Sequence, residues 1–265
     1  MARLQPWYKT VAPRSDLREG KPLDASEFAV HLDHVKEGSA TDDYTFPDRF
    51  FDRTYLTDSL TSFAAQVVRR LSGNRVETSA VYNMATQFGG GKTHALTLLY
   101  HLATNGPVAN SWSGVSSILT RAGVTEVPKA EVAVFVGIRF DAITGRGGAD
   151  GTPHRRTPWG DFAFQLGGAE AYEKVAAHDE AGEAPGGDVI LDFLSKDKPS
   201  LILMDEVINY ISRYRGTGWG AQLYPEPLGR GARPKQRCVG RIHPPVHRRN
   251  EPGGPPGLRA ASKNA

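Results

Sequence analysis

The sequence predicts an α/β fold in which helices cover both faces of a parallel sheet. Three observations support this prediction. Short apolar segments that are typical of strands alternate along the chain with segments that are typical of amphipathic helices. The strand-like segments are continuous apolar runs, as expected where both faces of a sheet are buried. The chain has 265 residues, which is enough for one large domain of this class.

The first predicted elements lie between residues 58 and 103. Residues 58–72 predict a helix, with Thr57 as its N-cap and Gly73 as its stop. Its apolar face consists of Leu60, Phe63, Ala64, Val67 and Leu71. Residues 79–84 (SAVYNM) predict a strand, and residues 93–103 (THALTLLYHLA) predict the helix that follows it.

Two further strands are expected at residues 132–137 (VAVFVG) and 201–204 (LILM). Between them, the glycine-rich segment 141–160 predicts a surface loop, and the stretches near 161–181 and 187–195 predict helices. The order is therefore helix, strand, helix, strand, helices and strand, which is the order of a parallel sheet with crossover helices.

Composition excludes several classes of protein. The chain has one cysteine, which rules out an internal disulfide framework and metal sites built from cysteine pairs. The start of the chain has no apolar signal segment, and LILM is the longest run of large aliphatic residues, far too short to cross a membrane. We therefore expect a soluble cytoplasmic protein without a membrane partner.

Charge and proline content divide the chain. From residue 216 onward there are nine Lys and Arg residues, two acidic residues and eight of the 18 prolines, without helical or strand periodicity. We expect residues 1–56 to form an N-terminal extension that packs on the core. Residues 57–224 should form the core itself, and residues 225–265 a disordered basic tail.

The segment Thr86–His94 (TQFGGGKTH) carries the strongest chemical signal. It places a glycine turn between a predicted strand and a predicted helix, where backbone N–H groups and the helix N-terminus bind phosphate. Lys92 would reach the β- and γ-phosphates, and the Thr93 hydroxyl would bind Mg²⁺. Thr86 stands where the usual phosphate-loop pattern has glycine. A glycine-rich turn with a solvated lysine is the alternative.

A second motif follows the last predicted strand, where Asp205 and Glu206 emerge at the carboxyl end of LILM. Ligands of open α/β sheets bind at this edge. In a phosphate-loop ATPase, Asp205 would hold the hydration shell of Mg²⁺, and Glu206 would polarise the attacking water. Taken alone, the pair could be an acidic helix N-terminus. Together, the two motifs predict a site for ATP and Mg²⁺ in a P-loop NTPase fold.

Over about residues 5–224 the chain resembles the prokaryotic P-loop ATPases of domain-of-unknown-function family 499, which are placed in the AAA+ group. The segments that carry the resemblance are Trp7-Tyr8, Phe50-Phe51, residues 54–57, 87–94, 156–160, 165–168 and 201–206. In that family the phosphate loop also lacks the first glycine.

The resemblance implies a nucleotide site at Gln87, Phe88, Gly89, Gly90, Gly91, Lys92, Thr93 and His94. It also implies ATP hydrolysis, a DNA partner or a DNA methyltransferase-containing defence complex, and homo-oligomers of the full-length protein.

Other residues have less specific patterns. His94 could contact nucleotide, but its position on the first helical turn equally suits contact with solvent or with the sheet. For Trp159, packing is a better interpretation than a base platform. Arg155 and Arg156 could contact phosphate, although a solvated loop pair is the better interpretation.

The resemblance stops near Pro225. When residues 234–244 are back-translated with permitted third bases and read from the second base of each codon, they give QNNVVLAVSI, which is typical of a buried strand. We therefore interpret the chain as the N-terminal part of a longer ATPase with a frameshift near this point. A sheet without its central strand should be incomplete, so we expect poor solubility and little ATPase activity from this polypeptide alone.

Three classes of function remain open. The leading one is an ATPase that couples hydrolysis to the remodelling of a DNA or protein partner. The second is a nucleotide-gated binding module without hydrolysis. The third is a phosphotransferase of the nucleotide-kinase type, which is less favoured because the Asp205-Glu206 pair suits water as the acceptor.

Overall fold

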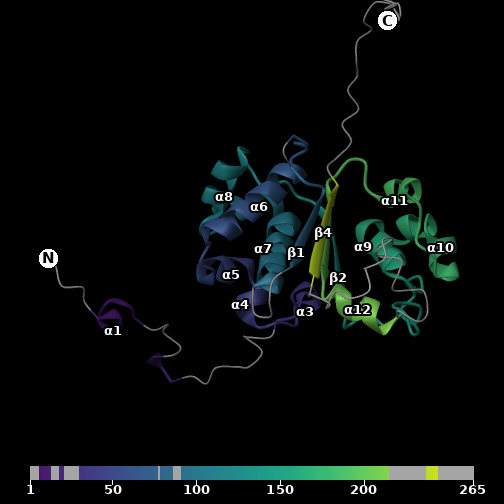
Figure 1. Ribbon diagram of the computed structural model, residues 1–265, viewed down its shortest axis with the longest axis horizontal. Helices are drawn as coiled ribbons and strands as arrows, with labels where there is room; N and C mark the ends of the chain where they lie inside the picture. The colour runs from purple at the N-terminus through teal and green to yellow at the C-terminus, as the bar shows by residue number, and fades with distance from the viewer. Residues whose placement is uncertain are drawn as a thin grey trace, which may run out of the picture.

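The computed structural model describes residues 6–12, 18–20, 30–76, 78–85, 91–214 and 237–243. A four-stranded sheet lies between two groups of helices, with α6, α7 and α8 on one side and α9 to α12 on the other (Figure 1). The strands are β1 (Val81–Ala85), β2 (Glu131–Val136), β3 (Ser200–Asp205) and β4 (Arg237–His243). The predicted α/β class is confirmed.

Among the described residues, the helices before β2 include four short ones near the N-terminus and three that cover the sheet. They are α1 (Trp7–Thr10), α3 (Leu32–Glu37), α4 (Asp42–Thr45), α5 (Pro47–Arg53), α6 (Asp58–Leu71), α7 (Lys92–Asn105), the 3₁₀ helix η2 (Gly106–Ser111) and α8 (Val115–Ala122). Those after β2 are α9 (Pro158–Glu173), α10 (Ala176–Ala181), α11 (Gly187–Phe193) and α12 (Val207–Arg213). In the described residues, no helix combines the length and apolar character that a membrane crossing needs.

The sheet has the order β1-β4-β3-β2 and is mixed, which corrects the expectation of a wholly parallel sheet. β2 and β3 pair in parallel, with Val136 opposite Asp205. β4 is antiparallel to both of its neighbours, β1 and β3. The three strands expected from the sequence therefore run in one direction, and their carboxyl ends lie at the same edge of the sheet.

The central position of the sheet is occupied by β4, which comes from the segment expected to be disordered. Met84 of β1 lies opposite Cys238, and Met204 of β3 lies opposite Val239. Residues 237–243 thus form a strand within the segment for which the sequence predicts a basic tail. The physical reason is that the facing edges of β1 and β3 present backbone N–H and C=O groups that a strand between them can pair.

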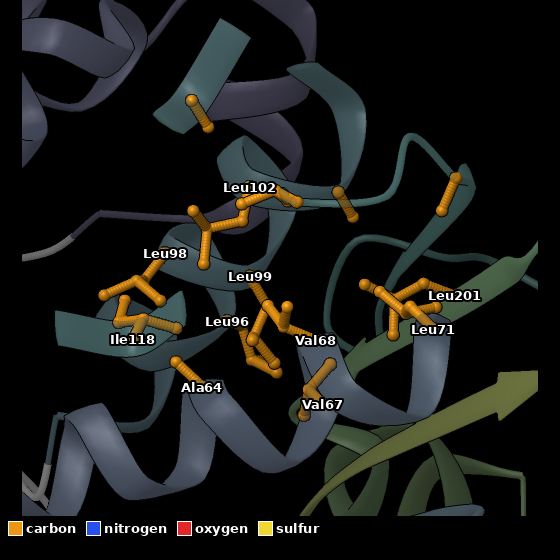
Figure 2. Packing of buried hydrophobic residues seen from close by; sticks show 14 of the residues in the cluster. Ala64, Val67, Val68, Leu71, Leu96, Leu98, Leu99, Leu102, Ile118 and Leu201 are labelled. Carbon is orange, nitrogen blue, oxygen red and sulfur yellow. The ribbon is translucent and has the colours of Figure 1, made fainter. Parts of the chain in front are cut away.

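Side chains that alternate along β2 and β3 build two separate cores. Val134, Val136, Leu201 and Leu203 belong to the core shared with α6, α7 and α8, whereas Ala133, Phe135, Ile202 and Met204 belong to the core shared with α9, α11 and α12. Figure 2 shows part of the first core, where α6 side chains such as Val67 and Val68 pack beside Leu96 and Leu99 of α7. This continuous burial on both faces explains the uninterrupted apolar runs of β2 and β3.

Local sequence signals set the ends of α6 as predicted. The Thr57 side-chain oxygen accepts a hydrogen bond from the backbone N–H of Leu60 at 3.2 Å, which caps the helix. Gly73 follows the last turn with φ of +89°, a conformation that glycine adopts without a steric penalty.

The N-terminal helices α4 and α5 pack on α7 through an aromatic cluster. The Phe50 ring lies between two histidines of α7, at 4.6 Å from the ring of His94 and 5.3 Å from that of His101. His101 is 2% exposed, and its Nε2 lies 2.8 Å from the carbonyl oxygen of Tyr44. Because a carbonyl can only accept, Nε2 of His101 carries the proton.

Candidate functional site

The two predicted motifs meet at the carboxyl edge of the sheet. Helix α7 starts at Lys92, directly after Gly91 in a left-handed conformation with φ of 70°, and β3 ends at Asp205. The Thr93 hydroxyl donates a hydrogen bond of 2.6 Å to Oδ2 of Asp205, although the two residues are 112 positions apart. Asp205 is 4% exposed. The fold therefore brings a hydroxyl and a buried carboxylate together beside the start of α7.

Glu206 has an unusual backbone conformation. Its φ of 51° makes it the only residue other than glycine with positive φ in the part of the chain that the structure describes. Such conformations are strained in residues with side chains and cluster at functional sites. The backbone N–H of Glu206 donates to Oδ1 of Asp205 at 2.9 Å, and Oε2 of Glu206 accepts from Nδ2 of Asn209 at 2.9 Å. The carboxylates of Asp205 and Glu206 thus have different hydrogen-bond donors, the Glu206 amide for Asp205 and the Asn209 side chain for Glu206.

Gly137, directly after β2, allows this arrangement. A Cβ atom at Gly137 would collide with the backbone carbonyl of Glu206. The backbone N–H of Gly137 also donates to the carbonyl oxygen of Asp205 at 2.9 Å, which extends the β2–β3 ladder by one residue. The end of β2 therefore lies directly against the end of β3.

Part of the predicted phosphate loop lies outside the described residues, namely Thr86, Gln87, Phe88, Gly89 and Gly90. Of the predicted nucleotide-binding segment, the structure describes Gly91, Lys92, Thr93 and His94. It brings Thr93 to Asp205 and directs His94 elsewhere.

The His94 ring contacts the N-terminal helices. Its Nε2 lies 3.1 Å from Oγ1 of Thr54, whose hydroxyl proton is already donated to the carbonyl of Phe50 at 2.7 Å. His94 therefore donates through Nε2 to Thr54. Burial lowers the pKa of His94, so its neutral form is favoured. These contacts give His94 a packing role between α7 and α5.

Arg155 and Arg156 differ from the expected solvated pair. Arg155 is 7% exposed, lies 3.2 Å from the carboxylate of Asp161 and stacks over the ring of Phe164 at 4.1 Å. Only Arg156 of the pair is exposed. The interpretation as a loop pair in solvent is wrong for Arg155, because the ion pair with Asp161 compensates for its burial. The half-buried Trp159 packs edge-on against Phe162 at 5.8 Å, which is the expected packing role.

Three residues near the site were missed by sequence reasoning, namely Asp33, Arg139 and Asn209. Asn209 contacts Glu206, and Arg139 lies in the turn after β2, where its Nε donates to Asp33 at 2.8 Å. A signal existed for Arg139, because it follows a predicted strand by two residues and so lies at the ligand-binding edge. No local pattern marks Asp33, whose position depends on the packing of α3.

The residues at this edge fit a magnesium ion. Thr93 and Asp205 supply hard oxygen donors at 2.6 Å from each other, and Mg²⁺ uses one or two protein oxygens together with phosphate oxygens and waters. In the described residues, no group of three or more His, Cys, Asp and Glu side chains is arranged to hold a metal ion. The donor set therefore suits a metal that arrives with a phosphate ligand.

Comparison with known protein families finds a match for the N-terminal part of the chain. Residues 16–129 match the family model of the DUF499 N-terminal domain. The resemblance to family 499 is thereby confirmed for this part of the chain, which includes Lys92, Thr93 and the helices that cover one face of the sheet. Neither the curated proteins nor the solved structures contain a match.

Proposed function

We propose that this protein is a P-loop ATPase of the AAA+ type that binds ATP together with Mg²⁺. The observation that carries the proposal is the 2.6 Å hydrogen bond between Thr93 and Asp205. Thr93 and Asp205 are predicted as metal ligands from two separate motifs. Random packing of a glycine turn and an acidic helix end would not be expected to bring these two side chains into contact. The match to the DUF499 N-terminal domain includes the segment around Lys92.

Each group has a distinct role in the proposed reaction. The amides before Lys92 and its ammonium group would bind the phosphates. Thr93 and Asp205 would hold Mg²⁺, which would supply positive charge to the phosphate oxygens. Glu206 orients the attacking water and accepts its proton. Asp205 is assigned to the metal because the bonds from Thr93 and from the amide of Glu206 hold its carboxylate beside Thr93.

The second candidate is a nucleotide-gated binding module without hydrolysis. It is favoured by the contact between Glu206 and Asn209, which occupies one oxygen of the proposed base. The nucleotide-kinase alternative has no such support. Sequence reasoning expected an inactive chain because the central strand would be missing, but β4 fills that position, so this reason for inactivity does not apply.

The nucleotide proposal is tested with two variants of the full chain. We expect Mg-ATP binding to be lost in Lys92→Ala, because the charge that neutralises the phosphates is removed. In Glu206→Gln, binding should persist while phosphate release falls by at least about a hundredfold, as is usual for loss of a catalytic base. Equal ATP affinity of the wild type and Lys92→Ala, measured by isothermal titration calorimetry, would exclude the proposed site.

The proposed partner comes from the family resemblance. Family resemblance favours a DNA or protein substrate that is remodelled during hydrolysis, as part of a restriction or phage-defence complex with a DNA methyltransferase, and favours a homo-oligomer. Stimulation of phosphate release by DNA would support the first of these partners.

A further inference from the structure

An ion pair at the same edge of the sheet is not used by the proposed chemistry. Nε of Arg139, in the turn after β2, donates to Oδ2 of Asp33 in α3 at 2.8 Å. The side chain of Asp33 is 7% exposed, whereas that of Arg139 is 47% exposed. A buried carboxylate thus holds a guanidinium group that reaches solvent.

The ion pair between Asp33 and Arg139 uses only some of the hydrogen-bonding atoms of the two side chains. Oδ1 of Asp33 is buried without a hydrogen-bond partner. Within the described residues, the single hydrogen bond of the Arg139 guanidinium is the one from Nε. Where an arginine serves only to neutralise a buried carboxylate, two parallel bonds that satisfy both oxygens are favoured. Here Asp33 holds Nε of Arg139 and leaves the two terminal guanidinium nitrogens of Arg139 for another acceptor.

The turn that carries Arg139 is fixed to the proposed catalytic strand. Gly137 donates to the carbonyl of Asp205, and its missing Cβ leaves room for the carbonyl of Glu206. The guanidinium of Arg213, in α12, donates to the carbonyl of Gly137 from the other side. Arg139 is therefore attached to a rigid turn two residues beyond the contact with Asp205, and not to a loop that can move away independently.

The order of the strands indicates which phosphate Arg139 would reach. Lys92 begins the helix that follows β1 along the chain, the end of β3 carries Asp205 and Glu206, and the end of β2 lies on the far side of β3. A triphosphate bound by Lys92, with its metal held by Thr93 and Asp205, would have its terminal phosphate at the end of β3, which is the neighbour of β2. Arginine suits that position because its charge is permanent and its fork-shaped donors match phosphate oxygens.

We propose that Arg139, oriented by Asp33, is a further phosphate-binding residue of this site and contacts the γ-phosphate of the bound nucleotide. The inference rests on the proposed function, because it assumes that the triphosphate lies between Lys92 and Asp205. It adds a residue that distinguishes ATP from ADP and that stabilises the charge on the γ-phosphate during transfer. Asp33 acts through Arg139 and is a positioning residue.

Binding of two nucleotides to the full chain tests the proposal. With Mg²⁺ present, Arg139→Ala should weaken binding of the non-hydrolysable analogue AMPPNP by about ten- to a hundredfold, the range for loss of a charge-assisted hydrogen bond, and leave ADP affinity unchanged. Arg139→Gln keeps a donor for Asp33 and should show the same selective loss if the alanine variant does not fold. Arg121→Ala is the matched control, since Arg121 pairs with Asp58 at 2.6 Å on the surface of α8.

The role of Asp33 is tested by Asp33→Asn, which keeps an oxygen for Nε. This variant should retain part of the preference for AMPPNP, whereas Asp33→Ala should lose most of it. Equal weakening of AMPPNP and ADP in the Arg139 variants, together with a lower melting temperature, would show a merely structural ion pair and overturn the proposal. No change for either nucleotide would overturn it too.

The same experiment separates this inference from the proposed function. If the wild type binds both nucleotides, and Lys92→Ala abolishes binding while Arg139→Ala has no effect, only the role of Arg139 is excluded. If the wild type binds neither nucleotide, the ATP site itself is excluded and the role of Arg139 with it.

Discussion

At the scale of single residues, the Arg156–Gly160 segment shows how a polar cluster can be purely structural. Asp179 is fully buried, and it accepts hydrogen bonds from the backbone N–H groups of Arg156 and Thr157 at 2.8 and 2.7 Å. The hydroxyl of Tyr172 contributes a weaker bond at 3.3 Å. Gly160 is needed because a Cβ there would collide with the Asp179 carboxylate. Burial, and then the charge of Asp179, raises the pKa of Tyr172 to about 12, so Tyr172 remains a donor.

We therefore expect Asp179→Ala to lower the free energy of unfolding by about 3 kcal/mol, because it leaves buried N–H donors without an acceptor. Urea denaturation measures this change. The exposed Asp188 provides the control, and Asp188→Ala should change stability by less than about 0.5 kcal/mol. A similar, small effect of both substitutions would show that Asp179 does not hold the start of α9.

Residue roles were predictable only where a motif fixed the chemistry. Thr93 and Asp205 are far apart in the chain, but their common role at the metal site could be predicted because each belongs to a motif with a known place at a strand end. Asp33 has no such pattern, and Arg139 is marked only by its place two residues after a predicted strand. Their pairing depends on how α3 packs against β2. The burial of Arg155 was mispredicted for a similar reason, since its partner Asp161 is visible only once α9 is folded.

At the scale of elements, α7 joins the N-terminal helices to the proposed site. The helix presents His94 and His101, seven residues apart, to the same ring of Phe50. Burial lowers the pKa of both histidines, and for His101 the bond to the Tyr44 carbonyl opposes this effect only in part. The docking of α4 and α5 therefore favours neutral imidazoles.

This arrangement predicts that stability falls in mild acid. Below the ordinary histidine pKa of 6.5, the unfolded chain binds protons that the folded chain still excludes, so the free energy of unfolding decreases as the pH falls through that value. The limiting slope is about 1.4 kcal/mol per pH unit for each histidine. Urea denaturation between about pH 8 and pH 5.5 measures it.

His101→Gln, which keeps a donor for the Tyr44 carbonyl, provides the matched comparison for this pH effect. It should remove about half of the slope, because one of the two titrating groups is lost while the hydrogen bond is kept. A slope that is identical in this variant and in the wild type would mean that protonation elsewhere in the chain causes the loss of stability.

Elements with strong periodicity were predicted closely, and those that depend on tertiary partners were not. The helix expected at residues 58–72 is α6 (Asp58–Leu71), and the strand expected at 201–204 is β3 (Ser200–Asp205). Helix α6 has a cap and an apolar face, and β3 has a continuous apolar run. In contrast, β4 contains glycine, arginine and histidine in place of a run of β-branched residues. Its conformation follows from the unpaired edges of its neighbours.

At the scale of the whole molecule, β4 determines whether the sheet is continuous. β1 carries the proposed phosphate loop, and β3 carries Asp205, but the two strands are not paired with each other. Every hydrogen-bonded connection between them within the sheet passes through β4. The geometry of the proposed site therefore depends on a segment more than 30 residues beyond Asp205 in the chain.

The single cysteine of the chain allows the position of β4 to be tested directly. Cys238 lies opposite Met84 in the antiparallel β1–β4 pair. Directly opposed residues in such a pair have Cα atoms about 4.5–5.5 Å apart, within the range of about 4.4–6.8 Å that a disulfide requires. Met84→Cys should therefore form an internal disulfide on mild oxidation of the dilute protein, and thiol titration in denaturant should find no free cysteine.

Asn83→Cys is the matched control because Asn83 lies opposite Val239, one position along the strand. Successive residues of a strand face opposite sides of the sheet, so this cysteine should keep its thiol, as should Cys238 in the same variant. Equal oxidation of the two variants would show that residues 237–243 contact β1 without a fixed register. If neither variant is oxidised, β4 does not lie beside β1, and the connection between the phosphate loop and Asp205 must be formed in another way.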